Sequence, residues 1–224
     1  MRLALFDLDH TLLPLDSDYE WGEFTIRIGW TDREEFGRRN KAFYDDYVAG
    51  RLDVHDYVRF ATEAVRLRGA EAAARAHEQF MRDVIAPAIR DEARALLQRH
   101  RDAGDEVVII TATNEFVTRP IAQALGVQQL LALELERGAD GWITGGIRGV
   151  PTMREGKVRR MEQWLAERGL RWQDVDSTFY SDSMNDVPLL EKVDHPVATN
   201  PDPRLRVLAR ERGWPILDLF PSQQ

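Results

Sequence analysis

The chain has 224 residues, of which 43% are hydrophobic and 30% charged, proportions typical of a soluble globular protein with one large domain or two modest ones. A formal net charge of −8 argues against a broad nucleic-acid surface, because such surfaces need clustered positive charge. The absence of cysteine excludes disulfides and thiolate chemistry, and the absence of a long apolar run or a basic leader predicts a cytoplasmic protein without membrane contact.

The first predicted element is a buried strand within the stretch 3–11. A short apolar run there ends in Asp7, Asp9 and Thr11, three polar residues at alternate positions. Open α/β folds bind ligands at the carboxyl ends of their strands, and two neighbouring carboxylates need solvent or a cation. Taken alone, the pattern fits an ordinary strand with an acidic turn equally well.

The segment after this strand has helical periodicity and no convincing strand pattern. Its apolar residues predict helices over 20–28, 34–48, 54–68 and 70–84. Gly50 and Gly69 separate predicted helices, and Asp32 and Asp53 are predicted N-caps. We therefore expect a helical insertion over 14–87.

An alternation of strands and helices follows the insertion. Strands are expected over 107–110, 177–181, 196–199 and 215–219. A helix is expected over 91–104, with Asp91 as its N-cap. Another is expected to end at Gly126, with Pro120 either in its first turn or at a kink. Further helices are expected over 155–168, 186–193 and 204–212. Segments 131–136 and 142–147 flank a turn and predict a β-hairpin, and the tail 221–224 is expected to fray.

This pattern predicts an α/β fold. We expect a doubly wound, Rossmann-like parallel sheet formed by residues 1–13 and 88–224, with a helical cap over 14–87 and a β-hairpin flap.

Polar groups follow three predicted strands, and parallel strands bring their carboxyl ends to one edge of the sheet. These groups are Asp7 with Asp9, Thr111, and Asp182 with Asn185 and Asp186. Carboxylate and amide oxygens suit Mg²⁺, and a hydroxyl donor and the isolated Lys157 suit phosphate oxygens. The set is typical of phosphoryl transfer, in which the protein positions the group and neutralises its charge.

The chain resembles the haloacid-dehalogenase-like hydrolases, in particular their phosphoserine-phosphatase-like branch with a helical cap after the first strand. The four motifs occur in order, as Asp7-x-Asp9-x-Thr11, Thr111 after an apolar strand, Lys157, and Asp182-x-x-Asn185-Asp186. The resemblance covers essentially the whole chain and is least specific in the cap.

The resemblance implies a covalent mechanism. Asp7 would be the nucleophile that forms an aspartyl-phosphate, and Asp9 the general acid and base, with a pKa raised by Asp7. Thr111, the backbone N–H of Ala112 and Lys157 would hold the phosphoryl oxygens.

The resemblance also implies Mg²⁺ as the cofactor. The ion would bind Asp7, the backbone carbonyl of Asp9, and Asp182. Asn185 and Asp186 would orient its waters.

The substrate implied is a small phosphomonoester. The acid nine residues past the nucleophile, which binds the substrate amine in phosphoserine phosphatases, is Asp16 here. With Asp18 and Glu20 it forms an acidic cluster that favours a cationic amine, and Arg59 stands where a carboxylate-binding Arg is expected.

Two departures from phosphoserine phosphatases keep the substrate open between phosphoserine, histidinol phosphate and another small phosphate ester. Thr111-Ala112-Thr113 replaces Ser-Gly-Gly, and Ser181-Asp182-Ser183-Met184 replaces Gly-Asp-Gly-Ala. The non-enzymatic alternatives are a receiver domain, which would carry its acceptor Asp on an interior strand, and a degenerate binding module, which would lack a motif residue. The oligomeric state is left open.

Overall fold

The computed structural model describes residues 1–48 and 51–220. Within those residues, seven strands form one sheet in the order β4-β3-β2-β1-β5-β6-β7. Their bounds are β1 Arg2–Phe6, β2 Glu106–Asn114, β3 Gln129–Arg137, β4 Ile143–Arg148, β5 Asp176–Ser181, β6 His195–Thr199 and β7 Ile216–Leu217. Neighbouring strands pair in parallel except β4, which runs antiparallel to β3. The predicted α/β fold and β-hairpin are confirmed.

The strand order explains where a ligand site belongs. From β1 the chain adds β2 and β3 on one side and then places β5 on the other side. The carboxyl ends of β1 and β5 therefore flank the point at which the order reverses, which is where doubly wound sheets bind ligands. Asp7 follows β1 and Asp182 follows β5, so both acids lie at this point.

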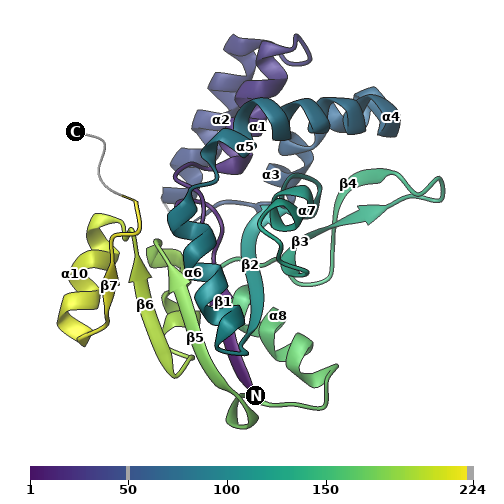
Figure 1. Ribbon diagram of the computed structural model, residues 1–224. Helices are drawn as coiled ribbons and strands as arrows, with labels where there is room; N and C mark the ends of the chain where they lie inside the picture. Colours follow the sequence, from purple (N-terminus) through teal and green to yellow (C-terminus); the bar gives the residue numbers. More distant parts are fainter. Residues whose placement is uncertain (49–50, 221–224) are drawn as a thin grey trace.

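Helices cover both faces of the sheet because alternate strand residues point to opposite sides. Ala4 and Phe6 belong to the apolar cluster that contains residues of α6 (Asp91–Asp102) and α7 (Glu115–Ala124). Leu3 and Leu5 belong to the other cluster, under α8 (Glu155–Ala166), α9 (Val187–Leu190) and α10 (Pro203–Arg212). Figure 1 shows α6 and α8 on opposite faces of the sheet.

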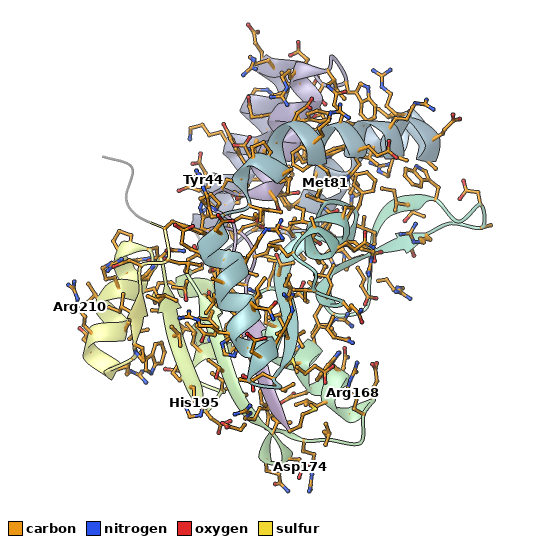
Figure 2. All side chains as sticks on the ribbon, in the orientation of Figure 1. Tyr44, Met81, Arg168, Asp174, His195 and Arg210 are labelled. Carbon is orange, nitrogen blue, oxygen red and sulfur yellow. The ribbon has the colours of Figure 1, made fainter. Side chains whose placement is uncertain are left out.

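The remaining helices gather beyond the carboxyl ends of the strands, at the top of Figure 1. We call them the cap helices: α1 Ser17–Arg27, α2 Arg33–Val48, α3 Val54–Ala61 and α4 Glu63–Phe80. A π-helical turn, Met81–Ile85, and α5, Ala86–Ala88, lead from them to α6. Figure 2 labels Tyr44 and Met81 near the junction of cap helices and core, far from Asp174 and His195.

Aromatic packing attaches α1 to its neighbours. The Trp21 ring lies 5.2 Å from Phe80 of α4 and 5.4 Å from Phe116 of α7, measured between ring centroids. Rings at this spacing bury large apolar areas and pack favourably edge to face. The acidic N-terminal turn of α1 is therefore held close to the core.

The hairpin packs against the cap helices as well as the core. Gly145 in β4 has φ +90, and a Cβ there would lie 2.8 Å from Nε of Arg66 in α4. Only glycine allows this backbone conformation and this approach without strain. The flap and the cap helices thus meet above the sheet.

Several predicted boundaries were wrong, each for a local reason. The helix expected over 54–68 stops at Ala61, where Thr62 donates its hydroxyl to the Val58 carbonyl. Gly69, by contrast, separates two helical segments within α4 as predicted, because its backbone is non-helical there with φ +78 and ψ 168. Asp91 is the first residue of α6 and not its N-cap, which is Arg90.

Other detailed predictions were confirmed, or concern residues that the structure does not describe. Asp53 caps α3, and Asp32 accepts from Glu35 N at 2.9 Å. Pro120 lies inside α7. The separating residue Gly50 and the tail 221–224 lie outside the described residues. Among those that are described, no helix is long and apolar enough to cross a membrane.

Candidate active site

The nucleophile candidate Asp7 is fixed at the carboxyl end of β1. Its backbone N–H donates to the Tyr180 carbonyl at 2.9 Å, which continues the parallel ladder between β1 and β5 by one residue. The residue is 7% exposed. Because the backbone is held on the sheet, the carboxylate points from a rigid element into the ligand region.

Lys157 binds Asp7 directly. Its Nζ donates to Asp7 Oδ1 at 2.7 Å and to Asp186 Oδ2 at 2.6 Å, and the lysine is 2% exposed. Ser181 completes this network by donating its hydroxyl to the same Asp186 oxygen at 2.7 Å. The predicted convergence of Asp7, Lys157 and Asp186 is therefore observed.

A tightly packed loop leads into the first turn of α8, which carries Lys157. Arg154 has φ +50, a strained conformation for a residue with a side chain. A Cβ on Gly156 would lie 1.9 Å from the Pro151 carbonyl oxygen, so only glycine fits before Lys157. Strain and close packing concentrate where the loop reaches the candidate site.

Asp7 and Lys157 carry opposite charges in the folded protein. Burial raises the pKa of Asp7 to about 6 while Lys157 opposes the shift, so the carboxyl is mainly ionised at neutral pH. Burial opposes the charge of Lys157, but Asp186 and Asp7 outweigh it and raise the lysine pKa above its usual range. Lys157 is thus a permanent cation against the candidate nucleophile.

Asp182 lies opposite Thr11. The Thr11 hydroxyl donates to Asp182 Oδ1 at 3.2 Å and accepts from the Asp182 backbone N–H at 3.1 Å. Burial, followed by the charges of Asp7 and Asp186, raises the pKa of Asp182 to about 9. Asp182 is therefore a carboxylate that lacks a sufficient positive partner.

Asn185 lies in the short turn after Asp182. It accepts from Arg154 Nε at 3.3 Å and donates to the Ser183 hydroxyl at 3.2 Å. The contacts hold the amide beside the strand end, as the motif predicted.

Asp9 is held by two neutral donors from different elements. The Ser17 backbone N–H donates to Oδ1 at 2.8 Å, and the Thr113 hydroxyl donates to Oδ2 at 2.7 Å. Burial and then the charge of Asp16 raise its pKa to about 8, and Asp7 adds a smaller push. The sequence predicted the direction of this shift but named Asp7 as its source, whereas burial is the larger cause.

Thr111 and Ala112 occupy the end of β2. Thr111 is buried, and its carbonyl accepts from the Thr152 hydroxyl at 2.6 Å, while its own hydroxyl accepts from Thr113 N at 3.2 Å. Ala112 is exposed and lines a cavity of about 1130 Å³. Both residues thus lie at the edge of the sheet where the other polar groups converge.

This cavity lies between the end of β2 and the cap helices. Ala112, Thr113 and Asn114 line it from the core, and Asp16, Asp18 and Glu20 line it from the first turns of α1. The acidic cluster predicted from the sequence therefore faces the cavity. Asp16 is also the N-cap of α1, because its Oδ1 accepts from Asp18 N at 2.9 Å and Tyr19 N at 3.0 Å.

Asp18 is the acid of this cluster whose side chain has hydrogen-bond partners from two other elements. Tyr57 of α3 donates its hydroxyl to Oδ2, and Asn114 of the core donates to Oδ1 at 3.3 Å. Burial, followed by the charge of Asp16, raises the pKa of Asp18 to about 6. Both partners are neutral, so the carboxylate is solvated by dipoles and not by a cation.

Arg59 is not brought into this group. It lies on α3 with a side chain 56% exposed, is ion-paired with Asp56, and does not line the cavity. Among the described residues, two cationic side chains line the cavity, and both are already ion-paired. Arg39 pairs with Glu63 at 2.6 Å, and Lys41 pairs with Asp45 at 2.6 Å.

Sequence reasoning missed Thr113, Tyr57 and Asn114. Thr113 had a signal, because it stands where phosphoserine phosphatases carry glycine. Tyr57 and Asn114 had no such signal in the sequence, because they lie 39 and 96 positions, respectively, from Asp18, which they contact.

The arrangement fits Mg²⁺. Asp7, Asp182 and Asp186 bring three carboxylates close together with Lys157 as counter-charge, and the charges of Asp7 and Asp186 add to the effect of burial in raising the pKa of Asp182. No group of three acidic or histidine side chains forms a preformed metal cage within residues 1–48 and 51–220. Mg²⁺ usually keeps several waters and binds one or two carboxylates, so it requires no such cage.

The α/β fold and the converging carboxylates agree with the family that the chain matches. The chain belongs to the haloacid dehalogenase-like hydrolase family, which it matches over residues 4–191. This confirms the family that the motifs predicted.

Relatives along the whole chain narrow the class to phosphatases. A histidinol-phosphatase of Neisseria meningitidis is 43% identical over 218 residues, which is 97% of this chain and 98% of that protein. The phosphoserine phosphatase SerB1 of Mycobacterium tuberculosis is 36% identical and aligns with 96% of this chain over 70% of its own length. The chain is a phosphatase of this family.

Solved structures agree with the fold. A protein of unknown function from Bordetella pertussis superposes with a TM-score of 0.92 at 50% identity, covering 98% of this chain and 99% of its own. A substrate-bound phosphoserine phosphatase superposes with a TM-score of 0.62 at 18% identity, covering 97% and 92%. The second likeness shows the shared fold alone.

Proposed function

We propose that the chain hydrolyses the phosphate monoester of a small amino alcohol, with histidinol phosphate as the best representative, through an aspartyl-phosphate on Asp7. The observation that carries the substrate class is the acidic cavity wall of Asp16, Asp18 and Glu20, in a cavity whose described cations are already paired. A substrate amine finds carboxylates there, whereas a substrate carboxylate finds no free cation among the described residues of the wall. We further propose that residues 14–87 act as a cap over this cavity.

Asp7 and Asp9 divide the reaction into two displacements. An Asp7 carboxylate oxygen attacks phosphorus while the bond to the alcohol oxygen breaks, and Asp9 transfers its proton to that oxygen. In the second displacement Asp9 takes a proton from water, the water oxygen attacks phosphorus, and the bond to Asp7 breaks. The pKa of Asp9, about 8, keeps it protonated for the first displacement at neutral pH.

Lys157, Thr111 and the backbone N–H of Ala112 are proposed to hold the phosphoryl oxygens. Lys157 already contacts Asp7, so a phosphoryl group on that carboxylate would lie beside the ammonium. Thr111 is fixed through its backbone by Thr152. Donors held this rigidly need little reorganisation as charge develops on the oxygens.

Mg²⁺ is proposed to be held by Asp7, the backbone carbonyl of Asp9 and Asp182, with Asn185 and Asp186 placing its waters. When bound, the ion would neutralise phosphoryl charge and offset the repulsion between the carboxylates. Thr11 supports this arrangement by orienting Asp182 from the same turn that carries Asp9.

Asp18 is the acid that we assign to the substrate amine. It is ionised at neutral pH according to its pKa of about 6, and its donors are neutral, so an ammonium group would be its first cationic partner. Charge-assisted bonds of this kind are worth about 1.5 to 3 kcal/mol, or roughly tenfold or more in affinity.

The experiment compares kcat/KM, with Mg²⁺ present, for histidinol phosphate, its analogue without the amine, and phosphoserine. We expect histidinol phosphate to exceed both by about tenfold or more. Asp18→Asn should remove the preference over the analogue without the amine, whereas Asp56→Asn, an exposed acid on α3, should keep it. A preference for phosphoserine would contradict the amino-alcohol assignment and leave the phosphatase class unaffected.

A further inference from the structure

Thr113 binds the general acid candidate through its side chain, and no established role accounts for it. Its hydroxyl lies 2.7 Å from Asp9 Oδ2, and the residue lines the cavity between the core and the cap helices. Its backbone N–H donates to the Thr111 hydroxyl at 3.2 Å, so the position of Thr113 is tied to the end of β2. The contact therefore joins the acid to a rigid strand.

The other carboxyl oxygen of Asp9, Oδ1, already accepts a hydrogen bond. Ser17 donates its backbone N–H to Asp9 Oδ1 at 2.8 Å. A backbone N–H can only donate, so a proton on Oδ1 would oppose it, and the protonated carboxyl places its proton on Oδ2. Oδ2 is the oxygen that faces Thr113.

A hydroxyl is suited to this position because it can both donate and accept. It donates to Oδ2 when Asp9 is ionised, and it can rotate to accept from the Oδ2–H group of the protonated acid until the alcohol oxygen of the substrate takes that hydrogen bond. The carboxyl thus keeps one orientation in both displacements. A methyl group of the same size would fill the space but offer neither bond.

We propose that Thr113 is a positioning residue, which holds the Asp9 carboxyl in one orientation so that Oδ2 can pass its proton to the alcohol oxygen of the substrate. This rests on the proposed function, because it assumes that Asp9 protonates the leaving group. It goes beyond the family motifs, which assign Asp9 but leave its orientation unassigned.

The role has a signature that a general structural defect lacks. An alkyl alcohol needs protonation to leave, whereas a nitrophenolate leaves readily as an anion. kcat/KM reports the steps up to the departure of the alcohol, so hydrolysis of the shared phosphoenzyme does not affect the comparison.

The experiment measures kcat/KM for an alkyl phosphate and for 4-nitrophenyl phosphate in Thr113→Val and Thr113→Ser. We expect Thr113→Val to lower the value for the alkyl ester by about tenfold to a hundredfold and that for the aryl ester by less than about threefold, with KM little changed. Thr113→Ser should restore the alkyl ester to within about threefold of wild type. Thr144→Val is the matched control, because Thr144 donates to Glu136 at 2.6 Å on the exposed flap.

Equal losses on both esters in Thr113→Val, or no loss on the alkyl ester, would overturn the role of Thr113. Failure of Thr113→Ser to recover the alkyl ester would also overturn it. None of these results affects the phosphatase assignment, which fails separately if Asp7→Asn still turns over 4-nitrophenyl phosphate.

Discussion

Lys157 donates to Asp7 at 2.7 Å although the two residues are 150 positions apart in the sequence. The same ammonium binds Asp186 at 2.6 Å, so one buried cation joins the acids that follow β1 and β5. Burying charges is costly unless they are paired, and here the pairing spans the strands that flank the ligand site. The contact therefore serves the fold as well as the proposed chemistry.

Lys157→Met should lower the free energy of unfolding by about 3 to 5 kcal/mol at pH 7, because it leaves two buried carboxylates without their cation. Urea denaturation measures this change. Lys41→Met is the control, since Lys41 is 73% exposed and its pair with Asp45 should contribute less than about 1 kcal/mol. Equal effects of the two substitutions would contradict the structural role of Lys157.

Asp18 should make the protein less stable as the pH rises from about 4 to about 6. Its pKa is raised from 3.8 to about 6 in the folded chain, so its stabilising contribution is present below about pH 4 and is lost as the pH passes through 6. Asp18→Asn should remove this loss and gain about 2 to 3 kcal/mol relative to wild type between pH 4 and pH 7. Urea unfolding at both pH values, with Asp56→Asn as control, measures it. An unchanged pH dependence in Asp18→Asn would show that Asp18 is solvated in the folded protein.

Mg²⁺ should raise the melting temperature of the wild-type protein, because a cation that binds only the folded state stabilises it by mass action. Asp182→Asn should lose most of this effect, whereas Asp194→Asn, on the loop before β6, should retain it. Differential scanning fluorimetry with and without EDTA reports binding independently of turnover. Equal shifts in both variants would place the metal elsewhere.

The position of Arg59 leads to an outcome different from the one its sequence context suggested. Because Arg59 is 56% exposed and paired with Asp56, Arg59→Ala should change kcat/KM by less than about twofold for both phosphoserine and histidinol phosphate. A loss of tenfold or more that is confined to phosphoserine would show that Arg59 reaches the substrate in a cap conformation other than this one.

The sequence predicts the sheet and the motif residues well because both depend on local patterns. Apolar runs mark the buried strands, and parallel pairing places the carboxyl ends of the strands at one edge, so the sequence alone predicts that Asp7 and Asp182 lie close together. The family motifs then assign chemistry to those positions.

The contacts of the cap were not predictable in the same way. Asp16 has the expected spacing from Asp7, but its side chain caps α1. Asp18 instead accepts hydrogen bonds from Tyr57 and Asn114, which belong to distant segments. Arg59 has the expected sequence context but faces solvent. Which face of a cap helix meets the cavity depends on packing between helices, and spacing alone does not determine it.

The most direct test of the account is to locate the phosphoryl group during turnover. Wild-type protein mixed with Mg²⁺ and histidinol phosphate, quenched in acid within one turnover and mapped by peptide mass spectrometry, should carry phosphate on Asp7. The same treatment of Asp7→Asn should yield no phosphopeptide. Phosphate on another residue, or full turnover by Asp7→Asn, would contradict the assignment of Asp7 as the nucleophile.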